Sequence, residues 1–178
     1  EKQLQNCPCD VVVRKIKPKL LSKQSNVYDA KENITGYAVV KATSNTVTVR
    51  YSECITDGKL DFTSCGGKEQ IQQDVFINCT PNALLHPRYS IHAFQYVEVT
   101  GGTIQHIEVV HSNVKQTSYF KCNNDTINWY HDAFIRTMLN NMHCGVPSDC
   151  PHRERLGYTG DGQLTAESAM LTLDSKLF

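Results

Sequence analysis

Residues 10–112 carry the alternation of hydrophobic and polar positions that is typical of β-strands. In the stretch TVTVRYSE, apolar side chains occupy every second position from Val47 to Tyr51, so one face is apolar and the other polar. Further stretches rich in β-branched and aromatic residues lie at 37–42, 74–78, 90–99 and 104–111. Short strands separated by turn residues such as Asp57-Gly58 and Gly101-Gly102 predict a mainly β fold, an antiparallel β-sandwich.

After His111 the apolar spacing becomes helical. Asn123 and Asn124 are candidate N-caps for a helix, and a second short helix is expected from about Asp161, after a Gly- and Pro-containing loop at 143–160. The expected apolar stripes are Ile127, Tyr130, Phe134 and Met138 on the first helix, and Ala166, Ala169, Met170 and Leu173 on the second. The pattern predicts an N-terminal extension at 1–9, a β-sandwich domain at 10–112 and a helical segment at 113–178.

Composition and charge argue against several classes of function. The 178 residues contain 18 basic and 18 acidic side chains with no block of like charge, which argues against nucleic acid as a partner. No apolar run approaches the roughly 18 residues that a membrane span needs. The histidines His111, His131, His143 and His152 are scattered, so neither a metal site nor a cofactor is predicted.

Cysteines and sequons indicate a secreted, extracellular glycoprotein. The sequons are Asn33-Ile34-Thr35, Asn78-Cys79-Thr80 and Asn124-Asp125-Thr126. An even number of cysteines favours disulfides over free cytosolic thiols, and Cys54 is expected to pair with Cys65 across the loop between them. The other pairings stay open. The disulfide candidates are Cys7, Cys9, Cys54, Cys65, Cys79, Cys122, Cys144 and Cys150. The first residues lack the pattern of a signal peptide, so we expect a mature chain whose signal has been removed or was never included.

The segment DCPHRERLGYTGDGQ, at 149–163, gathers the side chains that glycoside cleavage needs. A carboxylic acid must protonate the leaving oxygen, and an inverting mechanism needs a second carboxylate roughly 6.5–9.5 Å away to activate water. Asp149 and Asp161 favour the protonated, acid form of Glu154, whereas Arg153 opposes it. The alternative is a solvated, salt-bridged connector in which Asp161 is a helix N-cap.

Several ordered stretches carry a resemblance to one enzyme family. VPSDCPHRERLGYTGDGQ resembles VPTDCPQRERLGWTGDAQ, the signature of bacterial-type α-L-rhamnosidases. Upstream, YDAKENITGYAVVKA resembles the family's FDFGQNMVGWVRLKV, and HPRYSIHAFQYVEVTGG resembles EPRFTYHGFRYVEVTG. VVHSNVKQTSYFKCNNDTINWYHDAF resembles VVHSDLERTGSFECSNPLLNQLHEN. The resemblance extends from about Val27 to Gln163.

The resemblance implies both a fold and a site. In this family of inverting glycoside hydrolases a β-sandwich precedes a six-hairpin (α/α)6 barrel, so 10–112 correspond to the sandwich and 123–178 to the first barrel helices. Glu154 matches the general acid. The sugar-binding positions of the family match Asp149, Arg153, Tyr158 and Asp161, and Tyr158 replaces the usual Trp. No cofactor is implied.

Two functions are predicted from these features. The first is a non-catalytic, secreted module derived from a rhamnosidase that assembles with itself as a homo-oligomer or filament. It is expected because the family's catalytic base lies further along the barrel, and because Phe134, Met138 and Leu173 should be exposed in a partial barrel. The alternative is the N-terminal part of an active inverting α-L-rhamnosidase, and a lectin that binds rhamnose-containing glycans lies between them.

Overall fold

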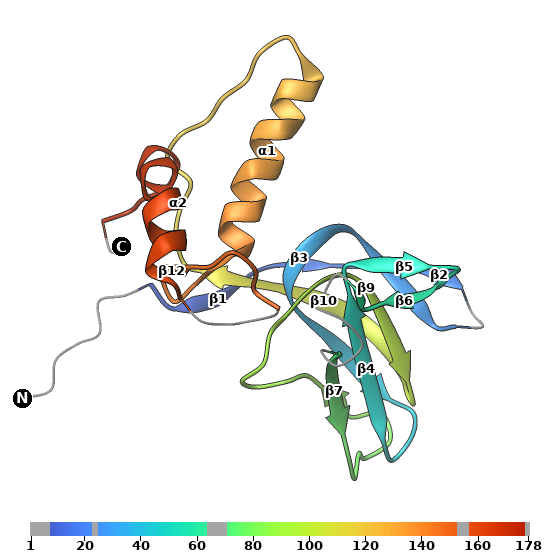
Figure 1. Cartoon of the computed structure of the whole chain (residues 1–178). Coiled ribbons are helices and arrows are strands. Elements are labelled where there is room, and N and C mark those ends of the chain that lie inside the picture. Colours follow the sequence, from blue (N-terminus) through green and yellow to red (C-terminus); the bar gives the residue numbers. More distant parts are fainter. Residues whose placement is uncertain (1–7, 23–24, 64–70, 153–156, 177–178) are drawn as a thin grey trace, which may run out of the picture. The chain divides into compact units, whose positions relative to one another are not determined.

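The computed structural model describes residues 8–22, 25–63, 71–152 and 157–176, and shows a mainly β fold with two helices near the C-terminus (Figure 1). The elements in chain order are β1 (Asp10–Ile16), β2 (Lys19–Ser22), β3 (Val27–Ala42), β4 (Val47–Ser52), β5 (Cys54–Thr56), β6 (Lys59–Asp61), β7 (Gln72–Phe76), β8 (Leu84–Leu85), β9 (His92–Thr100), β10 (Gly102–Ser112), α1 (Asp125–Asn140), β11 (Met142–His143), β12 (Val146–Pro147) and α2 (Thr159–Thr172).

One antiparallel sheet dominates the fold. Its order is β1-β10-β3-β9-β4-β7, and β2 and β8 add further pairs to β3. The long strand β3 pairs with β9 through its first half and with β10 through its second half. The sequence prediction of antiparallel strands in this region is confirmed, since all five stretches named above contribute to β3, β4, β7, β9 and β10.

Tight turns with left-handed backbone join neighbouring strands. Gly101, with φ +77°, links β9 to β10, and a Cβ on it would lie 2.2 Å from the Thr46 carbonyl oxygen. The Asp57-Gly58 turn between β5 and β6 has φ values of 52° and 73°. Positive φ at both central residues matches the twist of a two-residue hairpin, so these predicted turns are confirmed.

The alternation of β4 produces the core. Val47, Val49 and Tyr51 are fully buried and pack with Phe94 and Ile107 into one hydrophobic cluster. The apolar face predicted for TVTVRYSE therefore faces inward.

A buried polar network lies within this core. The Tyr51 hydroxyl donates to Asp74 at 2.8 Å, His92 Nε2 lies 3.1 Å from the same carboxylate, and Ser90 donates to it at 3.1 Å. The Tyr51 ring stacks on His92 with 4.1 Å between centroids. Burial alone would raise the pKa of Asp74, but these hydrogen bonds outweigh it and hold that pKa below its usual value. Burial and the neighbouring carboxylate raise the pKa of the Tyr51 phenol.

The chain divides into two compact units. In the described residues, the β unit comprises 12–110 and 152, and the helical unit comprises 8–11, 111–151 and 157–176. Asn124 is the N-cap of α1, as predicted, because its side-chain oxygen accepts from the backbone N–H groups of Thr126 at 3.0 Å and Ile127 at 3.3 Å. The second predicted helix is present as α2, beginning two residues before Asp161.

The buried face of α1 differs from the expected one. Ile135 and Met138 are buried, whereas Ile127, Tyr130 and Phe134 are 48, 66 and 39% exposed. The helix carries two apolar stripes, and the stripe on Ile135 and Met138 is the one that packs on Ala169 and Leu173 of the α2 region. Exposure was therefore predicted correctly for Phe134 and wrongly for Met138 and Leu173, which are 7 and 2% exposed.

The expected disulfides are not formed at the cysteines whose thiols the structure shows. Free thiols are carried by Cys9, Cys54, Cys79, Cys122 and Cys144. Cys65, the predicted partner of Cys54, and Cys7 lie outside the described residues. The Cys79 side chain is 8% exposed and packs in the hydrophobic cluster of the sheet, so it acts there as a small apolar residue.

Candidate functional site

The charged segment recognised in the sequence begins after a small hairpin. Strands β11 and β12 pair antiparallel across Cys144 and Gly145, whose φ values are 50° and 76°. The sequence pattern predicts a loop here. Two strands of two residues are too short to produce an alternation pattern, and the Cys-Gly turn was the one available signal.

The carboxylate of Asp161 holds the two ends of the segment together. Its Oδ2 accepts the backbone N–H of Asp149 at 3.1 Å. Asp161 lies in the first turn of α2 rather than at the N-cap, which is Tyr158 and makes no side-chain capping bond. The expectation that Asp161 caps the helix is thus wrong, because its side chain reaches back to Asp149.

Gly157 allows the backbone before α2 to approach strand β12 closely. A Cβ on Gly157 would lie 2.2 Å from Cγ1 of Val146 on β12, so a larger residue would have to displace that side chain. The backbone before α2 therefore packs directly on the hairpin. Together with the Asp161–Asp149 hydrogen bond, this contact fixes both ends of the segment 149–161.

The candidate site residues fall into two groups. Asp149 and Tyr158 are exposed, the latter by 49%, and Asp161 is half-buried. Arg153 and Glu154, the predicted sugar ligand and general acid, lie outside the described residues. The structure therefore brings Asp149 and Asp161 together and places Tyr158 three residues before Asp161 at the start of α2.

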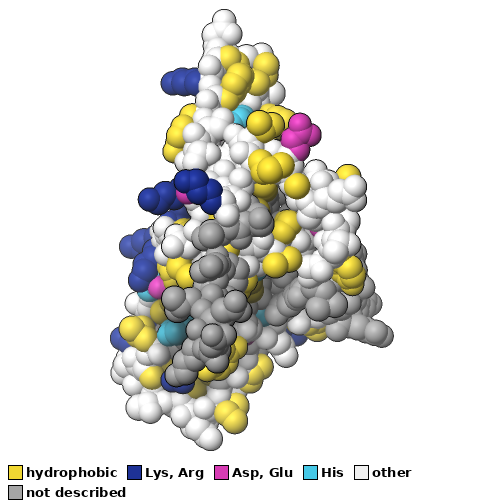
Figure 2. All heavy atoms as spheres, turned by 90° about the vertical axis from the view of Figure 1, so that its left-hand side faces the viewer, with side chains coloured by type: hydrophobic (Ala, Val, Ile, Leu, Met, Phe, Trp, Pro, Cys, Tyr) yellow, Lys and Arg dark blue, Asp and Glu magenta, His cyan; other side chains and the backbone are white. Residues whose placement is uncertain are grey.

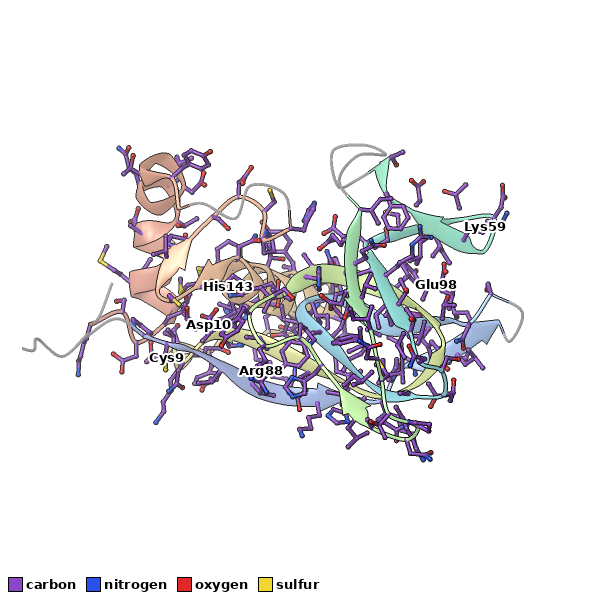
Figure 3. All side chains as sticks on the ribbon, turned by 90° about the horizontal axis from the view of Figure 1, so that it is seen from below. Cys9, Asp10, Lys59, Arg88, Glu98 and His143 are labelled. Atoms are coloured by element: carbon purple, nitrogen blue, oxygen red, sulfur yellow. The ribbon has the colours of Figure 1, made fainter. Side chains whose placement is uncertain are left out.

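A hydrogen-bond network ties the first strand to the hairpin. Asp10 accepts from the backbone N–H of Cys144 at 2.7 Å, and its other oxygen lies 2.8 Å from His143 Nδ1. Asp10 and His143 are labelled in Figure 3. The fully buried Ser112 hydroxyl donates to the Met142 carbonyl at 3.0 Å and accepts from Gly145 N–H at 2.8 Å.

Burial alone would raise the pKa of Asp10, but the hydrogen bonds from His143 and Cys144 outweigh it and lower that pKa. The network was missed in the sequence because its members are separated by up to 134 residues and no motif joins them. It supports the hairpin from which the candidate site begins.

An apolar cavity lies beside the segment within the helical unit. Its volume is about 280 Å³. The lining residues come from the hairpin and from α2 and the residues after it: Met142, Gly145, Pro147, Gly162, Thr165, Ala166, Ala169, Met170 and Ser175. Pro147 and Gly162 stand close in sequence to Asp149 and Asp161, so the cavity adjoins the candidate site.

The helical unit also presents large apolar side chains to solvent. Figure 2 shows hydrophobic side chains gathered in its upper part, where the loop before α1 and the first turns of α1 lie. The most exposed large apolar residues in the described part of this unit are Tyr119, Trp129, Tyr130, Leu164, Met170 and Leu171, at 63 to 84%. Such a concentration of apolar surface is characteristic of a face that another polypeptide covers.

Metal binding and membrane spanning find no support in the described part of the chain. No three His, Cys, Asp or Glu side chains there converge as metal ligands. His143 instead bonds Asp10, and His152 lies 3.9 Å from the Glu53 carboxylate. Neither described helix is long and apolar enough to cross a bilayer.

Two family models match the chain. Residues 19–118 match the bacterial α-L-rhamnosidase concanavalin-like domain. Residues 115–178 match the bacterial α-L-rhamnosidase six-hairpin glycosidase domain.

Individual relatives agree with these matches. An α-L-rhamnosidase of Formosa agariphila is 32% identical over 94 residues, which are 49% of this chain and 10% of that protein. The structure of an α-L-rhamnosidase from Dictyoglumus thermophilum matches with a TM-score of 0.83 at 32% identity, covering 94% of this chain and 20% of that one. The Streptomyces avermitilis α-L-rhamnosidase complexed with L-rhamnose matches with a TM-score of 0.84 at 25% identity, covering 96% and 18%.

The chain thus spans about a fifth or less of the length of these relatives. The matched ranges cover the strands from β2 onward and both helices, and the resemblance seen in the sequence is confirmed. On this evidence the chain belongs to the bacterial α-L-rhamnosidase family.

Proposed function

We propose that the segment 149–161 forms the acid-bearing wall of a site for α-L-rhamnosides, and that hydrolysis requires further polypeptide to enclose it. The observation that carries the proposal is the hydrogen bond from Asp149 N–H to the Asp161 carboxylate. It joins Asp149 and Asp161, two of the residues that match the family's sugar ligands, at the two ends of the segment that contains Glu154. A relative of known structure binds L-rhamnose.

Hydrolysis needs both the side chains of this wall and polypeptide that shields them from water. Glu154 protonates the leaving oxygen, Asp149 and Asp161 accept hydrogen bonds from sugar hydroxyls, and Tyr158 offers an aromatic face to the sugar ring. Two of the three described members of the wall, Asp149 and Tyr158, are exposed to water, and Asp161 is half-buried. An exposed carboxylic acid is a poor catalyst because water competes for its hydrogen bonds. The isolated chain is therefore expected to bind the sugar weakly and to turn over no substrate.

Titration calorimetry with L-rhamnose tests the binding. We expect measurable heat with the wild-type chain and its loss in Asp149→Asn. The matched control is Glu167→Gln, since Glu167 is an exposed acid on helix α2, outside the segment 149–161. Equal binding by all three proteins, or by none, would contradict the proposal. Release of phenol from an aryl α-L-rhamnoside by the isolated chain, abolished by Glu154→Gln, would show that the enclosure is unnecessary.

Self-association is a second candidate function, favoured by the exposed apolar surface of the helical unit. Trp129, Leu164 and Leu171 are 64, 84 and 67% exposed, and burial of one such side chain contributes about 1.5–3 kcal/mol. The chain would then be a secreted structural module that pairs through these faces. Light scattering should show oligomers that Leu164→Ser dissociates and that Gln163→Ser, at an exposed neighbouring position, leaves intact. A monomer at all concentrations excludes this function.

A further inference from the structure

The three sequons occupy different environments in the structure. Asn33 lies within strand β3, and its side-chain nitrogen donates to Glu53 at 2.7 Å. Asn124 is the N-cap of α1, and its side-chain oxygen accepts two backbone N–H groups. The Asn33 nitrogen, the atom to which a sugar would be attached, is therefore engaged, and the Asn124 side chain is held against the end of α1 by its oxygen.

Asn78 differs from both. It lies in the turn between β7 and β8, is exposed, and has φ 55°. Within the described residues no hydrogen bond engages its carboxamide. The next residue, Cys79, turns inward to the core, and Thr80 is exposed, so the two side chains that define the sequon both face solvent. An outward Asn-x-Thr in a surface loop is the setting that N-glycosylation requires.

Strand β7, which ends two residues before Asn78, is the free edge of the described sheet. In the described part of the structure β7 is last in the strand order and pairs only with β4. Ile71, Val75 and Ile77 lie along this edge at 40, 52 and 69% exposure. An apolar edge with unpaired backbone groups is a template for strand addition, and proteins protect such edges with charge, proline or a cover.

We propose that Asn78 is the N-glycan acceptor of this chain and that its glycan shields the free edge of β7. Asn78 follows the end of β7 by two residues, so a bulky, hydrated sugar attached there extends over the strand. In the transfer, Asn78 Nδ2 bonds to the sugar C1 of a lipid pyrophosphate-linked oligosaccharide supplied by the host. The bond from C1 to the pyrophosphate oxygen breaks, the lipid pyrophosphate leaves, and one amide proton passes to base. The proposal is independent of the rhamnoside site.

Intact mass tests the acceptor. The chain is produced behind a cleavable signal peptide in a eukaryotic secretory host, and lumenal and secreted protein are both analysed. Thr80→Ala is the informative variant because it removes the sequon and leaves Asn78 in its left-handed turn. We expect it to lose the mass of one glycan. Thr126→Ala, which removes the Asn124 sequon but not its cap, and Asn33→Gln should retain that mass. Unchanged mass in Thr80→Ala, or higher occupancy at Asn33 than at Asn78, would overturn the proposal.

Association of the same proteins tests the shielding. In size-exclusion chromatography with light scattering, Thr80→Ala should shift toward larger species relative to the glycosylated chain. Adding Val75→Lys should reverse the shift, because a charge on an edge strand opposes strand addition. Gln163→Lys, at an exposed position in the helical unit, is the control and should not reverse it. Identical profiles with and without the glycan, or equal reversal by both lysines, would show that the edge needs no cover.

Discussion

At the scale of single residues, Glu108 is the centre of a charge cluster on the outer side of the β unit. One oxygen lies 3.0 Å from Lys15 Nζ and 3.1 Å from His106 Nε2, and the other accepts from the Tyr37 hydroxyl at 2.8 Å. Burial alone would raise the pKa of Glu108, but these three donors outweigh it and lower the pKa to about 2. Burial and the same carboxylate raise the pKa of Tyr37 to about 12.

The Glu108 cluster should make stability depend on pH in acid. A carboxyl group whose pKa is lower in the folded state stabilises the fold above its unfolded pKa, here 4.5, and that contribution is lost as pH falls toward about 2. Glu108→Gln should remove about 1–2 kcal/mol of unfolding free energy at pH 7. It should also reduce the loss of unfolding free energy as the pH falls from 4.5 toward about 2. Urea unfolding at successive pH values measures both. Glu98→Gln on β9 is the control, and an unchanged acid profile in Glu108→Gln would contradict the assignment.

The Asp10 network gives a second residue-scale prediction. Asp10→Ala removes the acceptor of Cys144 N–H and the partner of His143, so we expect a loss of about 2 kcal/mol from the helical unit. Amide hydrogen exchange should accelerate at Cys144, while the amides of β4 stay protected. Lys17→Ala, exposed shortly after β1, serves as control. If exchange at Cys144 is unaffected, the carboxylate does not support the hairpin.

At the scale of elements, alternation predicted the strands well and periodicity predicted the helices only in part. Strand β4 has one apolar face, which consists of Val47, Val49 and Tyr51, so the burial of that face follows from the sequence. Helix α1 has two apolar stripes, and the choice between Tyr130 and Ile135 depends on where α2 lies, which is tertiary information. The short strands β8, β11 and β12, of two residues each, lie below the length at which a pattern can be recognised.

The N-cap of α1 was predictable because a capping side chain acts locally. Asn124→Ala leaves the N–H groups of Thr126 and Ile127 without their acceptor, so the helical unit should lose about 1 kcal/mol of stability. The unglycosylated protein from a bacterial host is the right material, because no sugar then contributes. Asn124→Asp should retain the stability, and Asn123→Ala, one residue earlier, should change it little. Helical circular dichroism during thermal unfolding records the difference, and equal melting of all variants would refute the cap.

At the scale of the whole molecule, the sequence predicted which residues belong to the candidate site, but it did not predict how they contact one another. The resemblance marked Asp149, Tyr158 and Asp161, yet it assigned Asp161 only to the sugar. Its bond to Asp149 N–H needs the turn of chain between them, which no spacing rule predicts. The disulfides expected from the cysteine count are not formed at the described cysteines that carry free thiols, for a related reason. Pairing depends on which thiols meet in space, and Cys79 meets the apolar core instead.

The two units have hydrophobic cores of different size, so they should differ in stability. The β unit packs Tyr51, Phe94 and many β-branched residues, whereas the helical core contains, among the described residues, five buried side chains including Met138. Met138→Ala should cost the helical unit about 2–5 kcal/mol. Trp129 is the one tryptophan of the sequence and lies on α1, so its fluorescence reports that unit alone. We expect its urea midpoint to fall in Met138→Ala while exchange protection of β9 is unchanged. The exposed neighbour Thr137→Ala is the control. A single transition that shifts equally for both probes would show that the units unfold as one.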